Sequence, residues 1–136
     1  MPAKRVLLVS TLLILLSHWA GMYQGLYLNV PFYDDLVHFL GGVWIGGIIL
    51  LILEKTGVFL EIKSSNKFGS AIGVIGLALI IGLGWEWFEW FLARYAESLG
   101  TSVNLQPSIQ DTLSDMVLDG LGAGIATLIS KKIKPD

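Results

Sequence analysis

The sequence predicts an all-α, polytopic membrane protein folded as a four-transmembrane-helix antiparallel bundle. Three observations predict it. Hydrophobic residues make up 54% of the 136-residue chain and charged residues only 15%, whereas soluble domains carry about a quarter charged residues. Four apolar segments approach or exceed the roughly 20 residues that cross a bilayer. The basic residues also gather on one side of these segments. We treat residues 1–136 as a single transmembrane domain.

The four expected spans are residues 6–28, 36–53, 68–93 and 112–130. Lys4 and Arg5 precede the first span as they would precede the apolar region of a signal peptide. No small-residue cleavage site follows Leu16, so we interpret this segment as a retained span. The fourth span differs from the others because Asp115 and Asp119 lie inside it.

The basic residues predict the orientation. With four spans, only Arg94 falls on one side of the membrane, and eight basic residues fall on the other. These eight are Lys4, Arg5, Lys55, Lys63, Lys67, Lys131, Lys132 and Lys134. Positively charged loops are typical of the cytoplasmic side. We therefore expect a multi-pass protein of the plasma (inner) membrane with both termini in the cytoplasm. Eight of the 11 acids then belong to the outer half.

Two classes of function are disfavoured. The Lys and Arg residues form no stripe interleaved with aromatic residues, so no nucleic-acid partner is expected. The chain has no cysteine, which excludes a thiolate metal site and a disulfide framework.

The glycines predict close helix packing. Each expected span carries a pair of glycines four residues apart, a spacing that lets helix backbones approach in lipid. Such pairs favour a compact bundle, or a homo-oligomer if some of them face a second copy of the chain. The pairs are Gly21 with Gly25, Gly42 with Gly46, Gly69 with Gly73, and Gly120 with Gly124.

Ionisable residues lie in three rows near the outer ends of three expected helices. One helix face can carry Asp34, Asp35 and His38, since residues three or four apart are neighbours. A second row holds Glu86 and Glu89, and a third holds Asp111, Asp115 and Asp119 at four-residue spacing. A charge facing lipid is costly, so the three rows are expected to face the bundle interior or a water-filled cleft.

The expected chemistry follows from the shortage of positive charge. Crowded carboxylates take up protons, bind a metal or bind a cationic ligand. One imidazole with several carboxylates suits a divalent ion: Zn, Mn, Fe, Mg or Ca. The expected metal ligands are His38, Glu86, Glu89, Asp111 and Asp115, with Asp34, Asp35 and Asp119 at the rim of the site. Glu86 and Asp115 are the candidate catalytic residues.

Structural alternatives remain at several of these positions. Asp34 could cap its helix, and Ser108 with Asp111 fits a capping box. His18, with no acid nearby in the sequence, fits a packing role. The cluster as a whole could be a polar core without chemistry. The aromatic residues Trp85, Trp87, Trp90 and Tyr95 fit an interfacial belt better than a substrate-stacking surface.

Three motifs resemble a known family. Tyr33–Gly42, Trp85–Trp90 and Gln110–Ala123 resemble segments of the YjdF-like small inner-membrane proteins and, more distantly, of the VanZ-like membrane proteins. The matching positions are Asp34, His38, Glu86, Asp111, Asp115 and Gly120. The chain is shorter than a typical YjdF-like protein, and it lacks the Arg of VanZ-like proteins unless Arg94 replaces it. The resemblance implies a membrane protein with a polar site, tied to the cell envelope or to glycopeptide tolerance.

Three functions remain open at this point. In the first, the outward-facing site binds a divalent metal and acts on or holds a lipid or lipid-linked envelope substrate. If that protein is an enzyme, a metal-dependent membrane hydrolase or transferase is expected. In the second, the protein is a non-catalytic membrane partner or regulator. In the third, the acids conduct protons or a cation, as in transporters.

Overall fold

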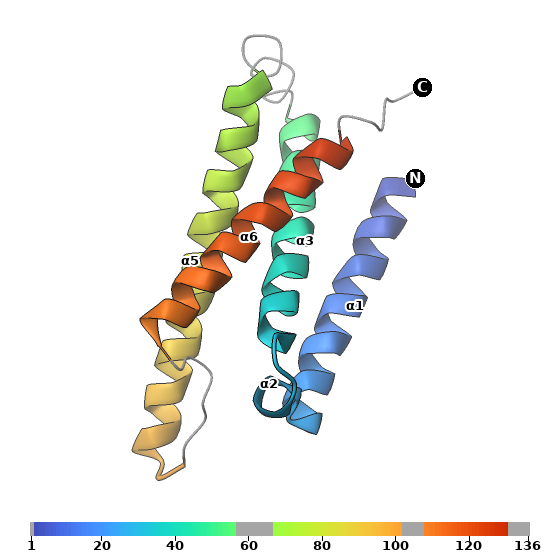
Figure 1. Ribbon diagram of the computed structural model, residues 1–136. Coiled ribbons are helices and arrows are strands. Elements are labelled where there is room, and N and C mark those ends of the chain that lie inside the picture. The colour runs from blue at the N-terminus through green and yellow to red at the C-terminus, as the bar shows by residue number, and fades with distance from the viewer. Residues whose placement is uncertain (1, 57–66, 102–107, 131–136) are drawn as a thin grey trace.

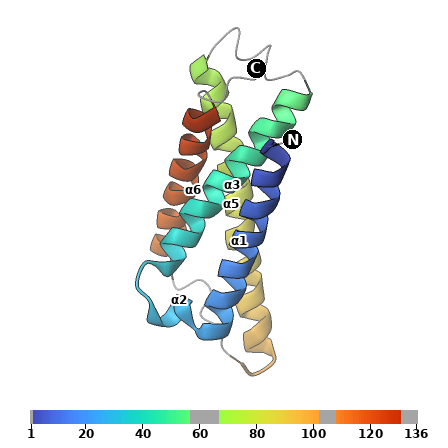
Figure 2. The same cartoon turned by 90° about the vertical axis from the view of Figure 1, so that its right-hand side faces the viewer.

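The regular structure of the described residues is helical. The computed structural model describes residues 2–56, 67–101 and 108–130. The helices are α1 (Pro2–Gln24), α2 (Leu26–Asn29), α3 (Tyr33–Lys55), α5 (Lys67–Ser98) and α6 (Ile109–Ser130). Helices α1 and α5 run antiparallel to α3 and α6 (Figures 1 and 2). The start of α1 and the end of α6 therefore lie at the same end of the molecule.

Among the residues whose side chains the structure describes, three helices are long and apolar enough to cross a membrane. They are α3, α5 from Phe68 onward, and α6. The expected first span, residues 6–28, is not a single helix. Helix α1 ends at Gln24 because Gly25 adopts a left-handed conformation with φ of 66°, which glycine takes at no steric cost. The four-span topology therefore stays a prediction.

The cytoplasmic location of both termini also stays a prediction. Among the eight basic residues that indicate it, only Lys55 has a described side chain, and that side chain is exposed. Lys63, Lys131, Lys132 and Lys134 lie outside the described residues.

Helices α3 and α6 form the most extensive helix pair, and glycines allow their close contact. A Cβ atom at Gly42 would lie 2.7 Å from the Cα of Asp119, and one at Gly122 would lie 2.7 Å from the backbone N of Val43. One turn further along, a Cβ at Gly46 would lie 2.9 Å from the Cα of Ala123. The two backbones thus touch where side chains are absent.

The glycine pair of α6 and Gly73 of α5 do not make such backbone contacts. On α6, Gly120 and Gly124 face Leu79 and Ile75 of α5 at ordinary van der Waals distance, so this pair does not make the backbone contact with α3. Gly73 of α5 has nothing within 4 Å of its Cβ position. Close helix approach through a glycine pair is therefore observed for Gly42 and Gly46.

Helix α5 closes the core, and α1 lies at the edge. The core cluster includes Val74 and Ala78 of α5, which pack with Ala123 of α6. Helix α1 packs along α3, where Trp44 donates a hydrogen bond to Thr11 Oγ1 at 2.9 Å. Large apolar side chains cover the remaining helix surfaces, as expected for surfaces that face lipid.

Replacing Gly42 with alanine should destabilise the bundle. The added methyl group would collide with the backbone of Asp119 rather than with a flexible side chain. Overpacking of this kind costs about 1–3 kcal/mol. Thermal unfolding in detergent should show a lower Tm for Gly42→Ala.

The matched control is Gly47→Ala on the same helix, because its Cβ position has nothing within 4 Å. Alanine is the better helix former, so the control should unfold at the wild-type temperature or above it. Equal Tm values for both variants would contradict the close contact of α3 and α6.

Candidate functional site

His38 lies at the centre of a group of carboxylates from three helices. Its ring is 6% exposed, and Nε2 lies 3.7 Å from Oδ1 of Asp34, one turn earlier on α3. Nε2 also lies 3.7 Å from Oε1 of Glu86 on α5. On the opposite side of the ring, Nδ1 lies 3.6 Å from Oδ1 of Asp119 on α6. Both ring nitrogens thus face acids.

The carboxylates around His38 are mostly buried. Glu86 is 1% exposed, and Glu89, Asp115 and Asp119 are each exposed by 7% or less. Their burial follows from the helix faces on which they lie. On α5, Glu86 and Glu89 point inward, whereas Trp87 is 73% exposed. We call this group the His38 cluster: Asp34, His38, Glu86, Glu89, Asp115 and Asp119.

Two sets of side chains in the His38 cluster have the geometry to hold a metal ion. One set is Asp34, His38 and Asp115, and the other is His38, Glu86 and Glu89. Within each set, one ligand atom from each residue lies within 4.8 Å of the other two. Both sets share His38, and neither includes Asp119. The sequence-predicted residues His38, Glu86, Glu89 and Asp115 are therefore brought together.

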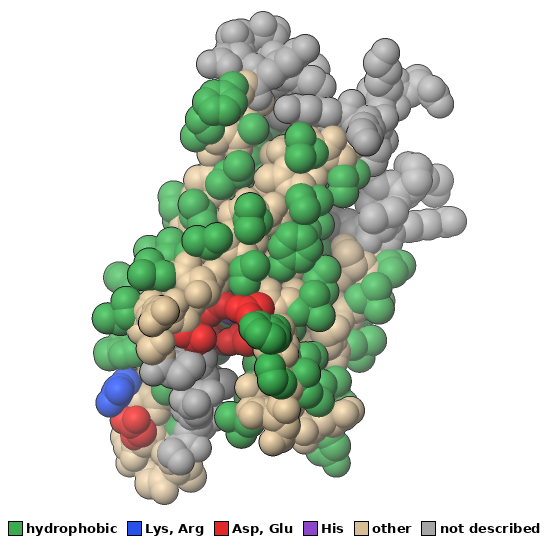
Figure 3. Space-filling view, in the orientation of Figure 1, with side chains coloured by type: hydrophobic (Ala, Val, Ile, Leu, Met, Phe, Trp, Pro, Cys, Tyr) green, Lys and Arg blue, Asp and Glu red, His purple; other side chains and the backbone are tan. Residues whose placement is uncertain are grey.

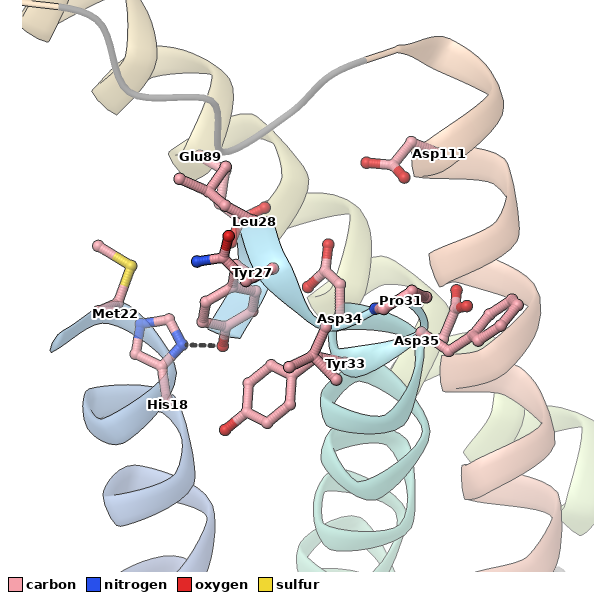
Figure 4. A pocket seen from close by; sticks show the side chains of 13 residues that line it. His18, Met22, Tyr27, Leu28, Pro31, Tyr33, Asp34, Asp35, Glu89 and Asp111 are labelled. Carbon is pink, nitrogen blue, oxygen red and sulfur yellow. Dashed lines mark hydrogen bonds between the residues drawn. The ribbon is translucent and has the colours of Figure 1, made fainter. Parts of the chain in front are cut away.

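A pocket of about 290 Å³ opens beside the cluster, where α1, α2 and the start of α3 meet. Asp34 and Glu89 of the cluster line it, so the pocket reaches the His38 cluster. We call it the α2 pocket, and its side chains come from α1, α2, α3, α5 and α6 (Figure 4). The lining residues are His18, Met22, Tyr27, Leu28, Asn29, Val30, Pro31, Phe32, Tyr33, Asp34, Asp35, Glu89 and Asp111.

The remaining predicted site residues have different positions. Asp111 and Asp35 are half-buried and line the α2 pocket rather than the cluster. Asp119, expected at the rim, lies 4% exposed against His38. In the space-filling view, the acids gather in a hollow surrounded by apolar side chains (Figure 3).

The helix-capping interpretations of Asp34 and of Ser108 with Asp111 have different outcomes. The N-cap of α3 is Phe32, without a side-chain cap hydrogen bond, so the capping interpretation of Asp34 is wrong. At the start of α6, the backbone N–H of Asp111 donates to Oγ of Ser108 at 3.1 Å. Ser108 thus caps α6, and the Asp111 side chain is left to line the α2 pocket.

Sequence reasoning missed the link between His18 and the site. Nδ1 of His18 and the hydroxyl of Tyr27 form a hydrogen bond of 2.7 Å. The His18 ring also contacts Trp85 edge-on, and Nε1 of Trp85 donates to Glu89 at 2.9 Å. His18 therefore supports the cluster through Trp85. The spacing of His18 along the chain gives no sign of this contact, because Trp85 comes from a distant helix.

Arg94 does not neutralise the cluster. Its guanidinium is largely exposed and pairs with Glu97 at 2.8 Å on the same helix. The side chain that the structure places beside the carboxylates of Asp34, Glu86 and Asp119 is the imidazole of His38. One imidazole faces five carboxylates in the cluster. This excess of acid favours proton uptake or cation binding.

The chain belongs to a family of membrane proteins. Residues 1–135 match the model of the family described as predicted membrane protein (DUF2238). No curated protein and no solved structure is found to match the chain. The family description agrees with the apolar helices α3, α5 and α6 and identifies the chain as a membrane protein.

Replacing His38 with alanine should destabilise the protein strongly. The change removes the partner of three buried or half-buried carboxylates, and losing one member of a buried ion pair costs about 3–5 kcal/mol. Chemical unfolding in detergent measures the difference. Glu97→Gln is the control, because it removes only an exposed ion pair worth less than about 1 kcal/mol. Wild-type stability of His38→Ala would contradict the central position of His38.

Proposed function

We propose that this member of the DUF2238 family binds a divalent metal ion at the His38 cluster and acts on or holds a lipid or lipid-linked envelope substrate. The main observation behind this proposal is that two sets of side chains meet at His38, each with ligand atoms within 4.8 Å of one another. A buried, acid-rich cluster in a membrane protein supports the hypothesis of a functional site, because charge in the membrane is costly.

The spacing of the ligand atoms supports a bound ion. Nε2 of His38 lies 3.7 Å from an oxygen of Asp34 and 3.7 Å from an oxygen of Glu86. Direct hydrogen bonds would measure about 2.7–3.2 Å. Two ligands each about 2.1 Å from a tetrahedral zinc ion lie about 3.4 Å apart. The observed separations are compatible with groups arranged around a shared cation.

The donor types narrow the choice of metal. One imidazole nitrogen with carboxylate oxygens suits Zn, Mn or Fe, whereas Mg and Ca prefer oxygen ligands alone. His38, Glu86 and Glu89 would form one edge of the site, and Asp34 and Asp115 the other. Asp111 is a more distant candidate, because its side chain lines the α2 pocket.

The α2 pocket supports the substrate class. Apolar side chains such as Leu28, Val30 and Phe32 line it together with the carboxylates of Asp34 and Asp111. A pocket of mixed character at the end of a transmembrane bundle fits a molecule with an apolar chain and a polar head. The resemblance of the Tyr33–Gly42 motif to YjdF-like and VanZ-like proteins adds support for an envelope substrate.

Glu86 and Asp115 are the acid–base candidates of this site. Both carboxylates are buried and lie close to His38. A general base must lie within hydrogen-bond reach of the group that reacts, and a substrate bound beside His38 would meet this condition. A divalent ion held there would supply Lewis acidity to a substrate oxygen. The reaction class that this arrangement supports is hydrolysis or group transfer.

The proposal places the α2 pocket on the outer side of the plasma (inner) membrane. This placement follows from the prediction that the basic residues are cytoplasmic, which assigns the other end of the bundle to the cytoplasm. Substrate would then arrive from the envelope side.

Purified protein should retain a divalent metal, and the cluster should hold it. Glu86→Gln and Asp115→Asn each remove a negative ligand while keeping the side-chain shape, so we expect at least a tenfold loss of Zn²⁺ or Mn²⁺ affinity. Elemental analysis before and after chelation, with titration of the metal-free protein, measures this. Glu97→Gln is the control on the same helix and should bind as the wild type does. Equal metal binding by all three variants, or none by the wild type, would leave the cluster as a polar core.

Reporter fusions should give the sidedness. A fusion after Lys63 should report from the cytoplasm and a fusion after Ser102 from the opposite side, because an odd number of membrane crossings separates them in the predicted topology. A cytoplasmic signal from the Ser102 fusion would contradict the outward-facing orientation of the site. It would not affect the metal proposal, which the metal-binding measurements test separately.

A further inference from the structure

Asp119 lies on a different side of the His38 ring from Asp34 and Glu86. Its carboxylate lies 3.6 Å from Nδ1, whereas Asp34 and Glu86 approach Nε2. Neither of the two metal-holding sets includes Asp119. A histidine that binds metal through one nitrogen commonly donates the N–H of the other to a carboxylate, which fixes the ring and its tautomer.

We propose that Asp119 is a positioning residue for His38: it accepts a hydrogen bond from Nδ1–H and thereby leaves Nε2 as the metal-binding nitrogen. This inference rests on the proposed metal site and deepens it. It divides the acids into two roles. Asp34, Glu86, Glu89 and Asp115 face the position of the ion, and Asp119 acts on the ion only through His38.

Two glycines make room for Asp119 at this position. A Cβ at Gly42 would collide with the Asp119 backbone, which is how α6 comes close enough to His38. A Cβ at Gly82 on α5 would collide with Oδ2 of Asp119 and would lie 3.2 Å from its Cγ. Oδ2 therefore rests on the bare backbone of α5, and Oδ1 faces His38. The carboxylate is held between two helices with Oδ1 towards Nδ1, and their separation of 3.6 Å must shorten for the hydrogen bond to form.

Gly82→Ala tests the role of this carboxylate without removing a charge. The new methyl group meets the tip of a side chain rather than backbone, so the bundle should fold and the carboxylate should move away from Nδ1. Gly84→Ala is the matched control, two residues along the same helix with nothing within 4 Å of its Cβ position. Asp119→Ala and Asp119→Asn complete the series, and Asn keeps an oxygen that can accept the N–H.

The first measurement is the tautomer of His38 by ¹⁵N NMR of histidine-labelled, metal-free protein, at a pH high enough to make the ring neutral. The chain has two histidines, so His38→Gln assigns the signals. We expect the Nδ1–H form in the wild type and in Gly84→Ala. Asp119→Ala and Gly82→Ala should shift towards the Nε2–H form that free histidine favours. An Nε2–H form in the wild type, or no shift in either variant, would overturn the proposal.

The second measurement is Zn²⁺ binding by the same variants. Loss of such an outer partner typically lowers metal affinity about 10–100-fold, so Asp119→Ala and Gly82→Ala should bind Zn²⁺ that much more weakly with unchanged stoichiometry. Asp119→Asn should recover part of the affinity. Unchanged affinity in Asp119→Ala, or Gly82→Ala binding as Gly84→Ala does, would count against the positioning role. If the wild type bound no Zn²⁺, the proposed function would fail, and the tautomer of the metal-free protein would still decide the role of Asp119.

Discussion

The contact between the backbones of α3 and α6 is the constraint on which the rest of the structure depends. Lipid offers no hydrophobic force to drive two helices together, so association in a membrane relies on close packing. At Gly42 and Gly122 the missing side chains allow backbone to meet backbone. His38 lies one turn before Gly42, and Asp119 lies directly against Gly42. The close packing at these glycines therefore also brings Asp119 to His38.

The same contact explains how the bundle tolerates so much acid. Isolated buried charge is costly, whereas charge that is paired and held in good geometry is less so. The small residues Ala78, Ala123 and Gly122 bring three helices close together just beyond the cluster. Helix rotation there is restricted, because a turn of α6 would drive side chains into α3. Glu86, Asp115 and Asp119 are thereby held in the interior, whereas Asp34 and Glu89 also line the α2 pocket.

Much of the site could be predicted from the sequence, because helical spacing fixes which residues share a face. The three rows of acids, the burial of Glu86 and Glu89, and the meeting of both with His38 all follow from three- and four-residue spacing together with the cost of exposing charge to lipid. Helix rotation could not be predicted in the same way. Asp119 was expected at the rim, but the close contact of Gly122 with α3 sets which side of α6 faces His38.

The break after α1 also escaped sequence reasoning. Apolar composition continues through Gly25 to Leu28, so hydropathy indicates one span. The left-handed conformation of Gly25 ends α1 and starts α2, and this turn brings Tyr27 to His18. A glycine can continue a helix or end it, and only tertiary contacts decide between the two. The α2 pocket, which depends on that turn, was therefore not predictable from composition or periodicity.

The distribution of ionisable residues along the three apolar helices favours binding or chemistry over conduction. Residues 39–53 of α3, 68–85 of α5 and 120–130 of α6 contain no Asp, Glu, Lys, Arg or His. These segments lie on the same side of the cluster and include its core neighbours Ile49, Leu50 and Val74. A proton or cation that reached His38 would meet apolar packing beyond it, and a charge without polar partners crosses such packing at high cost. Under the proposed function, a ligand would therefore leave by the side from which it arrived, through the α2 pocket. That path suits a site that binds a substrate, alters or holds it, and releases it to the same side.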